Sequence, residues 1–319
     1  MVLSKVGLSG ASGMVGGAII REVLARGMTG RLSSRKTPEV NHPSLHWSPW
    51  DLIEWKTPNG IDNIFSGVDA VIHAGASVPG SGPELSNKQL FDANVRSCLA
   101  LGEWAIDREV PLVYVSGAVV YEDSGQDRML ETSPVNSTGL GGFYGSTKFL
   151  AEQVLFSLEE KGLDLIVLRP TSIYGPGLSK EKMIPKFLRK SLDGEEILLQ
   201  PPVNDKINLI HSSDVARASL DAIESGVSGV FNLAGPSEVS IEEIANACVV
   251  NVGAGRVTIK PGVAPREPTI RYRVSCNKAN EKFGYEAKIH LSEGIRTVLL
   301  QDFHTDSRTG SEKVIRVTT

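Results

Sequence analysis

The feature that most constrains the fold is a glycine-rich turn between an apolar segment and a helical pattern near the N-terminus. Residues 2–8 are long and apolar enough for one buried strand, and the turn that follows contains Gly10, Gly13 and Gly16. A helix is expected immediately afterwards, over 14–26. Strand, glycine turn and helix in this order are typical of dinucleotide-binding folds, in which the helix N-terminus faces the pyrophosphate. The alternative is a turn whose glycines serve packing alone.

Apolar segments of strand length alternate with helical patterns through the first half of the chain. The expected strands are 2–8, 68–74, 111–116 and 164–169, and the expected helices are 14–26, 87–108 and 143–161. This alternation predicts an α/β fold with a doubly wound parallel (Rossmann) sheet. A strand between the first helix and residue 68 is only poorly defined.

After Gly177 the pattern becomes less regular, with helices expected over 183–188 and near 240–251 and 292–303. We expect two domains and a tail. Residues 1–177 and 208–235 would form a dinucleotide-binding domain, and residues 178–207 and 236–304 a smaller C-terminal cap that binds the substrate. Residues 305–319 are a polar tail.

Tyr144 and Lys148 lie four residues apart on the expected helix 143–161. Residues at this spacing are neighbours on a helix surface, so the Lys148 ammonium can favour the anion of the Tyr144 phenol. A tyrosine pKa must fall by roughly three units for the phenol to act as a base near neutral pH, which is more than one lysine supplies. An oxidised nicotinamide ring is cationic and could supply the rest. By itself, the pair also fits a solvated helix face.

Further motifs along the chain resemble those of one enzyme family. They lie at 69–76, 94–95, 113–116, 169–177, 210–216 and 231–235. Together with the glycine turn and the Tyr144–Lys148 pair, they make nearly the whole chain resemble the extended short-chain dehydrogenases/reductases, the NAD-dependent epimerase/dehydratase family. The resemblance implies hydride transfer to or from a nicotinamide, with Tyr144 and Lys148 as catalytic residues.

The resemblance also implies a set of cofactor-binding residues. Besides Tyr144 and Lys148, it includes Gly10, Ser12, Gly13, Met14, Val15, Gly16, Ser34, Arg35, Lys36, Asp51, Leu52, Ala74, Gly75, Ala76, Asn94 and Pro170. NAD-binding members of such folds usually place an acidic residue after the second strand, whereas NADP-binding members place an arginine there. Here Ser34, Arg35 and Lys36 occupy the region without a carboxylate. We therefore favour NADP over NAD, the alternative being a solvated basic turn.

One catalytic position departs from the family pattern. Relatives usually carry Ser or Thr four residues before the tyrosine of a Val-Tyr pair, here Tyr121, but that position is Gly117. Ser116 is the candidate replacement, with a merely structural hydroxyl as the alternative. Dehydratases of the family place Asp-Glu just before the Val-Tyr pair, whereas this chain has Ala118-Val119. Sugar 4,6-dehydration is therefore disfavoured.

The substrate is less well defined by the sequence. The resemblance implies contacts from Ser77, Gly117, Ala118 and Arg266, and Arg266 lies near the position where relatives bind a diphosphate. The same arginine could equally be solvated or paired. His211 and Asp214 are expected at a helix start, with Asp214 as the N-cap.

Composition excludes several other classes of protein. The 319 residues carry a net charge of −4 without a basic block, which argues against a nucleic-acid partner. No apolar run approaches the roughly 20 residues of a membrane helix. The three cysteines are widely spaced and indicate neither disulfides nor a metal site. These features predict a cytoplasmic protein with a small-molecule substrate, and relatives suggest a homodimer formed through helices 87–108 and 143–161.

Three functions remain open at this point. The first is an NAD(P)-dependent epimerase or oxidoreductase acting on a hydroxyl or carbonyl carbon, in particular of a sugar or nucleotide sugar. The second is a one-way NADPH-dependent reductase of an aldehyde or ketone. The third is a dinucleotide-sensing protein without catalysis, which the Tyr144–Lys148 pair disfavours.

Overall fold

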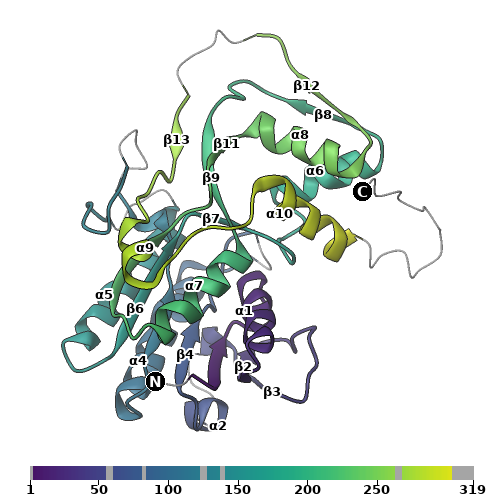
Figure 1. Ribbon diagram of the computed structural model, residues 1–319. Helices are drawn as coiled ribbons and strands as arrows, with labels where there is room; N and C mark the ends of the chain where they lie inside the picture. The colour runs from purple at the N-terminus through teal and green to yellow at the C-terminus, as the bar shows by residue number, and fades with distance from the viewer. Residues whose placement is uncertain are drawn as a thin grey trace.

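A seven-stranded parallel sheet forms the centre of the molecule (Figure 1). The computed structural model describes residues 3–54, 60–80, 84–122, 128–136, 141–262 and 268–303. From one edge to the other the strands are β10 (Gly229–Leu233), β6 (Leu165–Pro170), β5 (Leu112–Val115), β4 (Ala70–His73), β1 (Lys5–Ser9), β2 (Thr29–Ser34) and β3 (Leu45–Pro49). This order confirms the predicted doubly wound sheet. The strands β2 and β3 lie between α1 and residue 68, where the sequence indicates a strand only poorly.

Helices cover both faces of this sheet, each over its own apolar core. On one face, α1 (Met14–Ala25) packs beside α7 (Ser212–Glu224), and α9 (Asn277–Phe283) joins the same core. On the other face lie α2 (Ile61–Phe65), α4 (Ser97–Asp107) and α5 (Gly142–Glu159). Burial of both faces explains why the central strands are almost continuously apolar.

The expected helix 87–108 contains a change of helical geometry. It consists of α3 (Asn87–Phe91), a π-helical segment η2 (Asp92–Arg96) and α4. A capping box between Ser86 and Gln89 begins α3. Because π segments are short and often lie at functional sites, the position of Asn94 within η2 draws attention to it.

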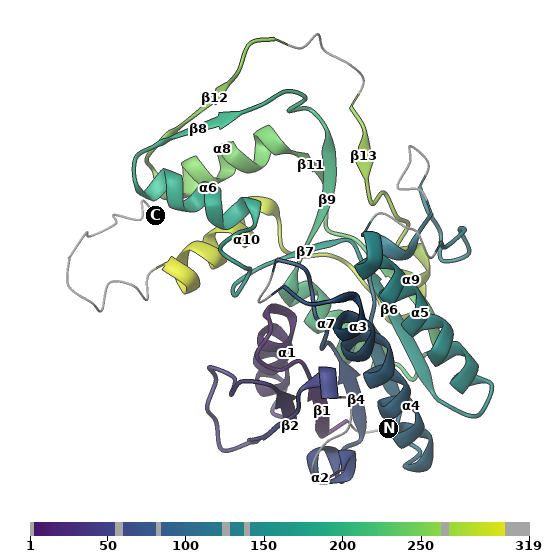
Figure 2. The same cartoon turned by 180° about the vertical axis from the view of Figure 1, so that it is seen from behind.

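Beyond the carboxyl ends of the central strands lies a smaller layer (Figure 2). It contains the helices α6 (Met183–Leu192), α8 (Ile241–Val252), α10 (Leu291–Val298) and the π-helical η4 (Leu299–Phe303). Its strands are β7 (Ser172–Tyr174), β9 (Lys206–His211), β11 (Glu238–Ser240) and β13 (Ile270–Arg271), with β8 (Glu196–Leu199) and β12 (Arg256–Ile259) as a separate pair. Short 3-10 turns, η1 (Leu52–Glu54) and η3 (Ala118–Val120), complete the elements.

The segment 208–235 does not return to the central sheet as a whole. Its last strand, β10, pairs with β6, whereas β9 pairs with β7, β11 and β13. Because β10 takes the free edge of β6, β9 finds its partners in the smaller layer instead. The division of the chain into a dinucleotide-binding domain and a substrate-binding cap stays a prediction, and the tail 305–319 lies outside the described residues.

Candidate active site

One large pocket lies at the carboxyl ends of the central strands, between the sheet and the smaller layer. Its volume is about 880 Å³, at the upper end of the range for small-molecule sites. It extends from the glycine turn after β1, past the ends of β4 and β5, to Tyr144 on α5 and to α6 of the smaller layer. Every predicted cofactor residue except Asn94 lines it. The pocket therefore has the position that the alternation of strands and helices predicts.

The glycine turn is shaped by close packing at two positions. Gly10 has φ +78°, in the left-handed region that favours glycine, and the Gly13 N–H donates to the Gly10 carbonyl at 3.0 Å. A Cβ on Gly16 would lie 2.1 Å from the Gly10 oxygen, so only glycine fits there. No side chain caps α1 at Gly13, and its first turn contains no acidic residue. The N-terminus of α1 is therefore suited to an anion, and Met14, Val15 and Gly16 there line the pocket.

The turn after β2 lies beside the glycine turn, at the end of the pocket away from Tyr144, and the Ala11 N–H donates to the Ser33 carbonyl at 3.0 Å. The buried Ser34 hydroxyl donates to the Lys36 carbonyl at 2.6 Å and accepts the indole N–H of Trp47 at 3.2 Å. These bonds fix the turn, while Arg35 and Lys36 remain exposed. The Asp51 carboxylate accepts the Ile53 N–H at 3.0 Å. Two exposed basic side chains, those of Arg35 and Lys36, thus follow Ser34 at the end of β2.

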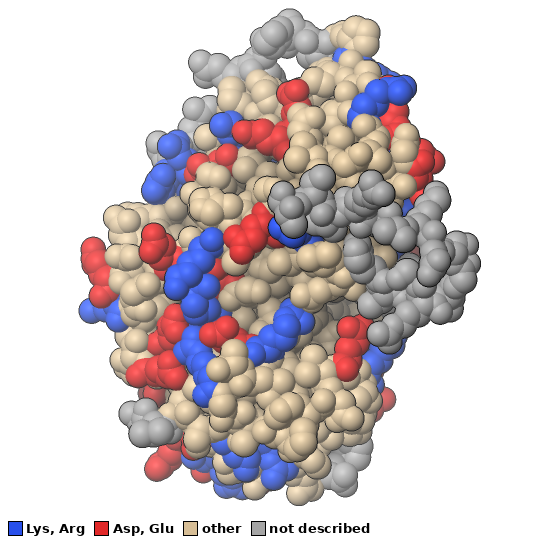
Figure 3. Space-filling view, turned by 45° about the vertical axis from the view of Figure 1, so that its right-hand side comes forward, with Lys and Arg blue, Asp and Glu red and all other residues tan. Residues whose placement is uncertain are grey.

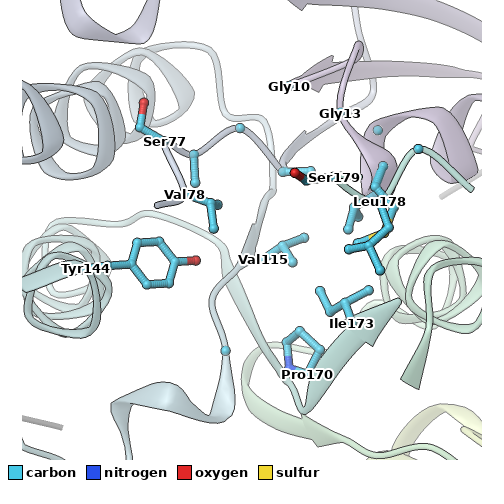
Figure 4. Close-up of a pocket in the computed structure, with 18 of the residues that line it drawn as sticks. Gly10, Gly13, Ser77, Val78, Val115, Tyr144, Pro170, Ile173, Leu178 and Ser179 are labelled. Carbon is cyan, nitrogen blue, oxygen red and sulfur yellow. The ribbon is translucent and has the colours of Figure 1, made fainter. Parts of the chain in front are cut away.

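Tyr144 points into the pocket from α5. Figure 4 shows its phenol oxygen directed toward the space bounded by Val78, Val115, Ile173 and Pro170. Burial, and secondarily the nearby Tyr272 phenol, raise the Tyr144 pKa above its usual value. The expected lowering by Lys148 is not found in this structure. Without a bound cation the surroundings of the phenol favour its neutral form.

Lys148 lines the pocket as a buried side chain instead of lying on a solvated helix face. Its ammonium donates to the Val115 carbonyl at 2.8 Å and lies 4.7 Å from the centre of the Tyr114 ring. Burial lowers the Lys148 pKa to about 8, against the opposing influences of Cys98 and Glu152. A lysine in this position can change its charge close to neutral pH.

Ser116 lines the pocket, but its hydroxyl is engaged elsewhere. It donates to the Glu152 carboxylate at 2.5 Å, and Arg169 donates to the same carboxylate at 2.7 and 3.0 Å. All three side chains are buried. This arrangement favours the structural alternative for Ser116. Glu152, which could have paired with Lys148 on a solvated helix face, forms an ion pair with Arg169 of β6 instead.

Gly117 and Ala118 border the pocket beside Tyr144. Gly117 is extended, and a Cβ placed on it would have no neighbour nearer than 3.6 Å. Space for a side chain is therefore present where the family pattern has a hydroxyl. Ala118 is buried and, with Val119, adds only apolar surface. Ser77 lines the same region, held by Asn94 through its backbone N–H at 2.7 Å.

Two predicted site residues are not among the described residues that line the pocket. Asn94 does not line the pocket, and its amide holds the backbone of Ser77 and the Thr147 hydroxyl from behind. Arg266 lies outside the described residues.

The prediction that Asp214 is a helix N-cap is wrong. The helix α7 begins at Ser212, and its N-cap is His211, whose Nδ1 accepts the Ser213 N–H at 3.2 Å. Asp214 instead accepts the backbone N–H groups of Lys288 and Ile289 at 3.1 Å each. Its carboxylate therefore ties the segment before α10 to α7.

Lys182 and Tyr272 are among the residues of the smaller layer that line the pocket and that sequence reasoning missed. Lys182 immediately precedes α6, and a lysine before the helical pattern at 183–188 could have indicated it. Tyr272 follows β13 with φ +59°, an uncommon conformation for a non-glycine residue. Nothing in the sequence marks that conformation.

The family assignment rests on the comparison with known proteins. The model of the NAD dependent epimerase/dehydratase family matches residues 6–234. The chain belongs to this family. It is thus a member of a family of NAD-dependent enzymes, and its predicted Tyr-Lys pair and glycine turn both lie within the matched residues.

Two curated relatives show the range of reactions among similar enzymes. The chain is 23% identical to a dTDP-glucose 4,6-dehydratase of Streptomyces niveus, with 95% of this chain and 94% of that protein covered. It is 26% identical to a dTDP-4-dehydro-6-deoxy-D-allose reductase of Streptomyces sp, with 77% and 80% covered.

Solved structures of the family share the fold. MoeE5 in complex with UDP-glucuronic acid and NAD superposes with a TM-score of 0.78 at 23% identity, with 95% of this chain and all of that one covered. The UDP-glucuronic acid 4-epimerase from Bacillus cereus, in complex with NAD, gives a TM-score of 0.78 at 16% identity, with 95% and 99% covered.

The described surface adds two negative observations. Among the described residues, no helix is both long and apolar enough to cross a membrane. On the face in Figure 3, acidic and basic side chains are intermixed, and no broad region of that face is basic.

Proposed function

We propose that the protein is an NAD(P)-dependent enzyme of the epimerase type, which oxidises a carbinol carbon of a sugar or nucleotide sugar and reduces it again. One observation carries the proposal: a single pocket joins the glycine turn at the N-terminus of α1 to the Tyr144 phenol on α5. Anion-binding geometry and a proton-transfer group therefore open onto the same space.

The residues present fit a dinucleotide. The N-terminus of α1 has no side-chain cap, and its glycines line the pocket with backbone alone, while Ala74, Gly75 and Ala76 extend this wall of small residues. Met14, Val15 and Gly16 would hold the pyrophosphate and Lys148 the nicotinamide end. When bound, the nicotinamide supplies the acceptor and donor of hydride.

In this proposal Tyr144 takes the hydroxyl proton of the substrate and later returns it. Because burial raises the Tyr144 pKa in this structure, the phenol must lose its own proton before it can accept one, and the positive charge of an oxidised nicotinamide would favour that phenolate. The Lys148 ammonium, which donates to the Val115 carbonyl and lines the pocket, would hold the nicotinamide ribose, and its charge together with that of the oxidised ring would favour the phenolate during proton removal. Reduction of the opposite face of the keto intermediate inverts the carbon.

Dehydration is not part of the proposal. Ala118 and Val119 carry no acid or base with which to eliminate water. The same observation is compatible with one-way carbonyl reduction, and similarity to a dTDP-4-dehydro-6-deoxy-D-allose reductase favours it as the second candidate. Cofactor retained after purification supports epimerisation, whereas net consumption of NADPH supports reduction.

A phosphorylated substrate is supported by Lys182. This lysine stands at the start of the ten-residue helix α6, where helix dipole and side chain both favour an anion, and it lines the pocket opposite the sheet. MoeE5 was solved with UDP-glucuronic acid. Nucleotide sugars are therefore the first substrates to test.

For the cofactor, we propose NADP in preference to NAD. Support comes from exposed Arg35 and Lys36 beside Ser34, with no carboxylate at the end of β2. The two solved structures named above contain NAD, so the preference needs direct measurement. Isothermal titration with both dinucleotides provides it, and clearly tighter binding of NAD would contradict the preference.

The proposal is tested with a panel of UDP- and dTDP-sugars in the presence of NADP or NAD. We expect Tyr144→Phe to lower turnover by about 100-fold or more while leaving dinucleotide binding unchanged. Tyr285→Phe is the matched control, because its phenol donates to the Ala234 carbonyl away from the pocket. Equal activity of Tyr144→Phe and the native protein would refute the role of Tyr144.

A further inference from the structure

The last described turn of the chain contacts a loop that lines the pocket. Both carboxylate oxygens of Asp302, in η4, accept the backbone N–H of Gly177, at 3.0 and 2.9 Å. Figures 1 and 2 show the end of this C-terminal segment close to α1. The Asp302 carboxylate thus holds the loop at Gly177, the last residue of the segment 1–177 that the sequence assigns to the dinucleotide-binding domain.

The loop held by Asp302 lies over the glycine turn. Gly177 lines the pocket, and a Cβ placed on it would lie 3.6 Å from the Cα of Met14. Met14 is the first residue of α1, at the helix end suited to a pyrophosphate. Gly177 has φ +86°, so this close, left-handed turn suits glycine.

The other side chains of η4 anchor it to the smaller layer. Leu299 is buried in the core that contains Leu188 of α6 and Ile295 of α10, and Phe303 packs against the same core. The Arg189 guanidinium lies 5.1 Å from the centre of the Phe303 ring. The segment η4 therefore packs against α6 and α10, while its Asp302 side chain contacts the Gly177 loop.

Charges from three other elements act on Asp302. Arg21 on α1 and Lys180 after the loop interact favourably with its carboxylate, whereas Glu39, after β2, opposes it. Arg21 also interacts with Glu39. The Asp302 carboxylate thus lies among mixed charges, next to a loop that lines the pocket.

We propose that Asp302 is a positioning residue that holds the Gly177 loop over the N-terminus of α1 and so slows release of the bound dinucleotide. The inference rests on the proposed function, since it requires a dinucleotide in the pocket. It concerns the rate of release and not the chemical step, because Asp302 itself does not line the pocket.

The test compares dinucleotide release from the native protein, Asp302→Ala and Asp302→Asn by stopped-flow fluorescence of NADPH or NADH. We expect Asp302→Ala to release the dinucleotide about 10-fold faster, as loss of hydrogen bonds to a charged acceptor implies. Asp302→Asn keeps an acceptor oxygen and should restore most of the native rate. Turnover at saturating dinucleotide should change less than twofold in both variants.

Glu196→Ala is the matched control, since Glu196 accepts hydrogen bonds from Thr258 and Arg256 in the smaller layer, away from the pocket. Its release rate should equal that of the native protein. Unchanged release from Asp302→Ala, or equal acceleration by Glu196→Ala, would overturn the inference. If Asp302→Ala does not fold, Asp302→Leu, which also lacks an acceptor for the Gly177 N–H, takes its place: faster release than from Glu196→Ala supports the inference, and an equal rate overturns it. Failure of the native protein to bind either dinucleotide would instead overturn the proposed function.

Discussion

The buried ion pair between Glu152 and Arg169 gives the most quantitative prediction. Neither side chain is more than 3% exposed, and Glu152 also accepts the Ser116 hydroxyl. Substitution Glu152→Ala would leave the Arg169 guanidinium buried without its counter-charge. Breaking such a pair from one side typically destabilises a protein by about 3–5 kcal/mol.

This loss of stability is measurable by thermal unfolding. An unfolding entropy of about 2.1 cal/mol/K per residue corresponds to about 0.7 kcal/mol/K for the 319 residues. A loss of about 4 kcal/mol therefore lowers the midpoint by about 6 °C, if the chain unfolds in one transition. Glu159→Ala, an exposed position on the same helix, is the control and should shift the midpoint by less than about 1 °C. A similar small shift for Glu152→Ala would refute the reasoning.

Three further predictions follow from the pocket. Burial lowers the Lys148 pKa to about 8 from 10.5, so between these pH values the unfolded chain binds more protons than the native protein. The free energy of unfolding should therefore rise with pH in this range, relative to that of Lys148→Met, and denaturant titrations at pH 8 and pH 10 measure it. Equal pH dependence in both proteins would contradict the burial of a titrating Lys148. Gly16→Ala forces a Cβ to within 2.1 Å of the Gly10 carbonyl, so calorimetry should find dinucleotide binding at least about 10-fold weaker, and native affinity would show that the turn does not bind the dinucleotide. Arg35→Ser should weaken NADP binding by several-fold while leaving NAD binding unchanged, and equal effects on both would exclude a phosphate contact.

The sequence predicts most of the central sheet because local signals suffice there. The helix expected over 14–26 is α1, which ends one residue earlier, and the helix expected over 143–161 is α5 to within two residues at each end. In contrast, β3 was not expected. None of its residues Leu45–Pro49 is buried, since β3 lies at a sheet edge, and the strand includes a proline, so the apolar signal is weak.

The smaller layer is harder to predict because its pairings are not local. The strand β9 pairs with segments of two or three residues at 172–174, 238–240 and 270–271. Strands this short carry too little pattern to be recognised in sequence. The engagement of Ser116 by Glu152, 36 residues away, depends likewise on how β5 and α5 meet, and no spacing rule indicates it.

The central claim is that the Tyr144 phenol and a nicotinamide ring face the same substrate carbon. A crystal structure with NADP or NAD bound tests it most directly. The account predicts the nicotinamide in the space that Tyr144 faces, beside Val115 and Pro170, with C4 and the phenol oxygen close enough for one carbonyl group to contact both. A dinucleotide whose nicotinamide lies outside that space, or a pocket that binds neither dinucleotide, would contradict the account.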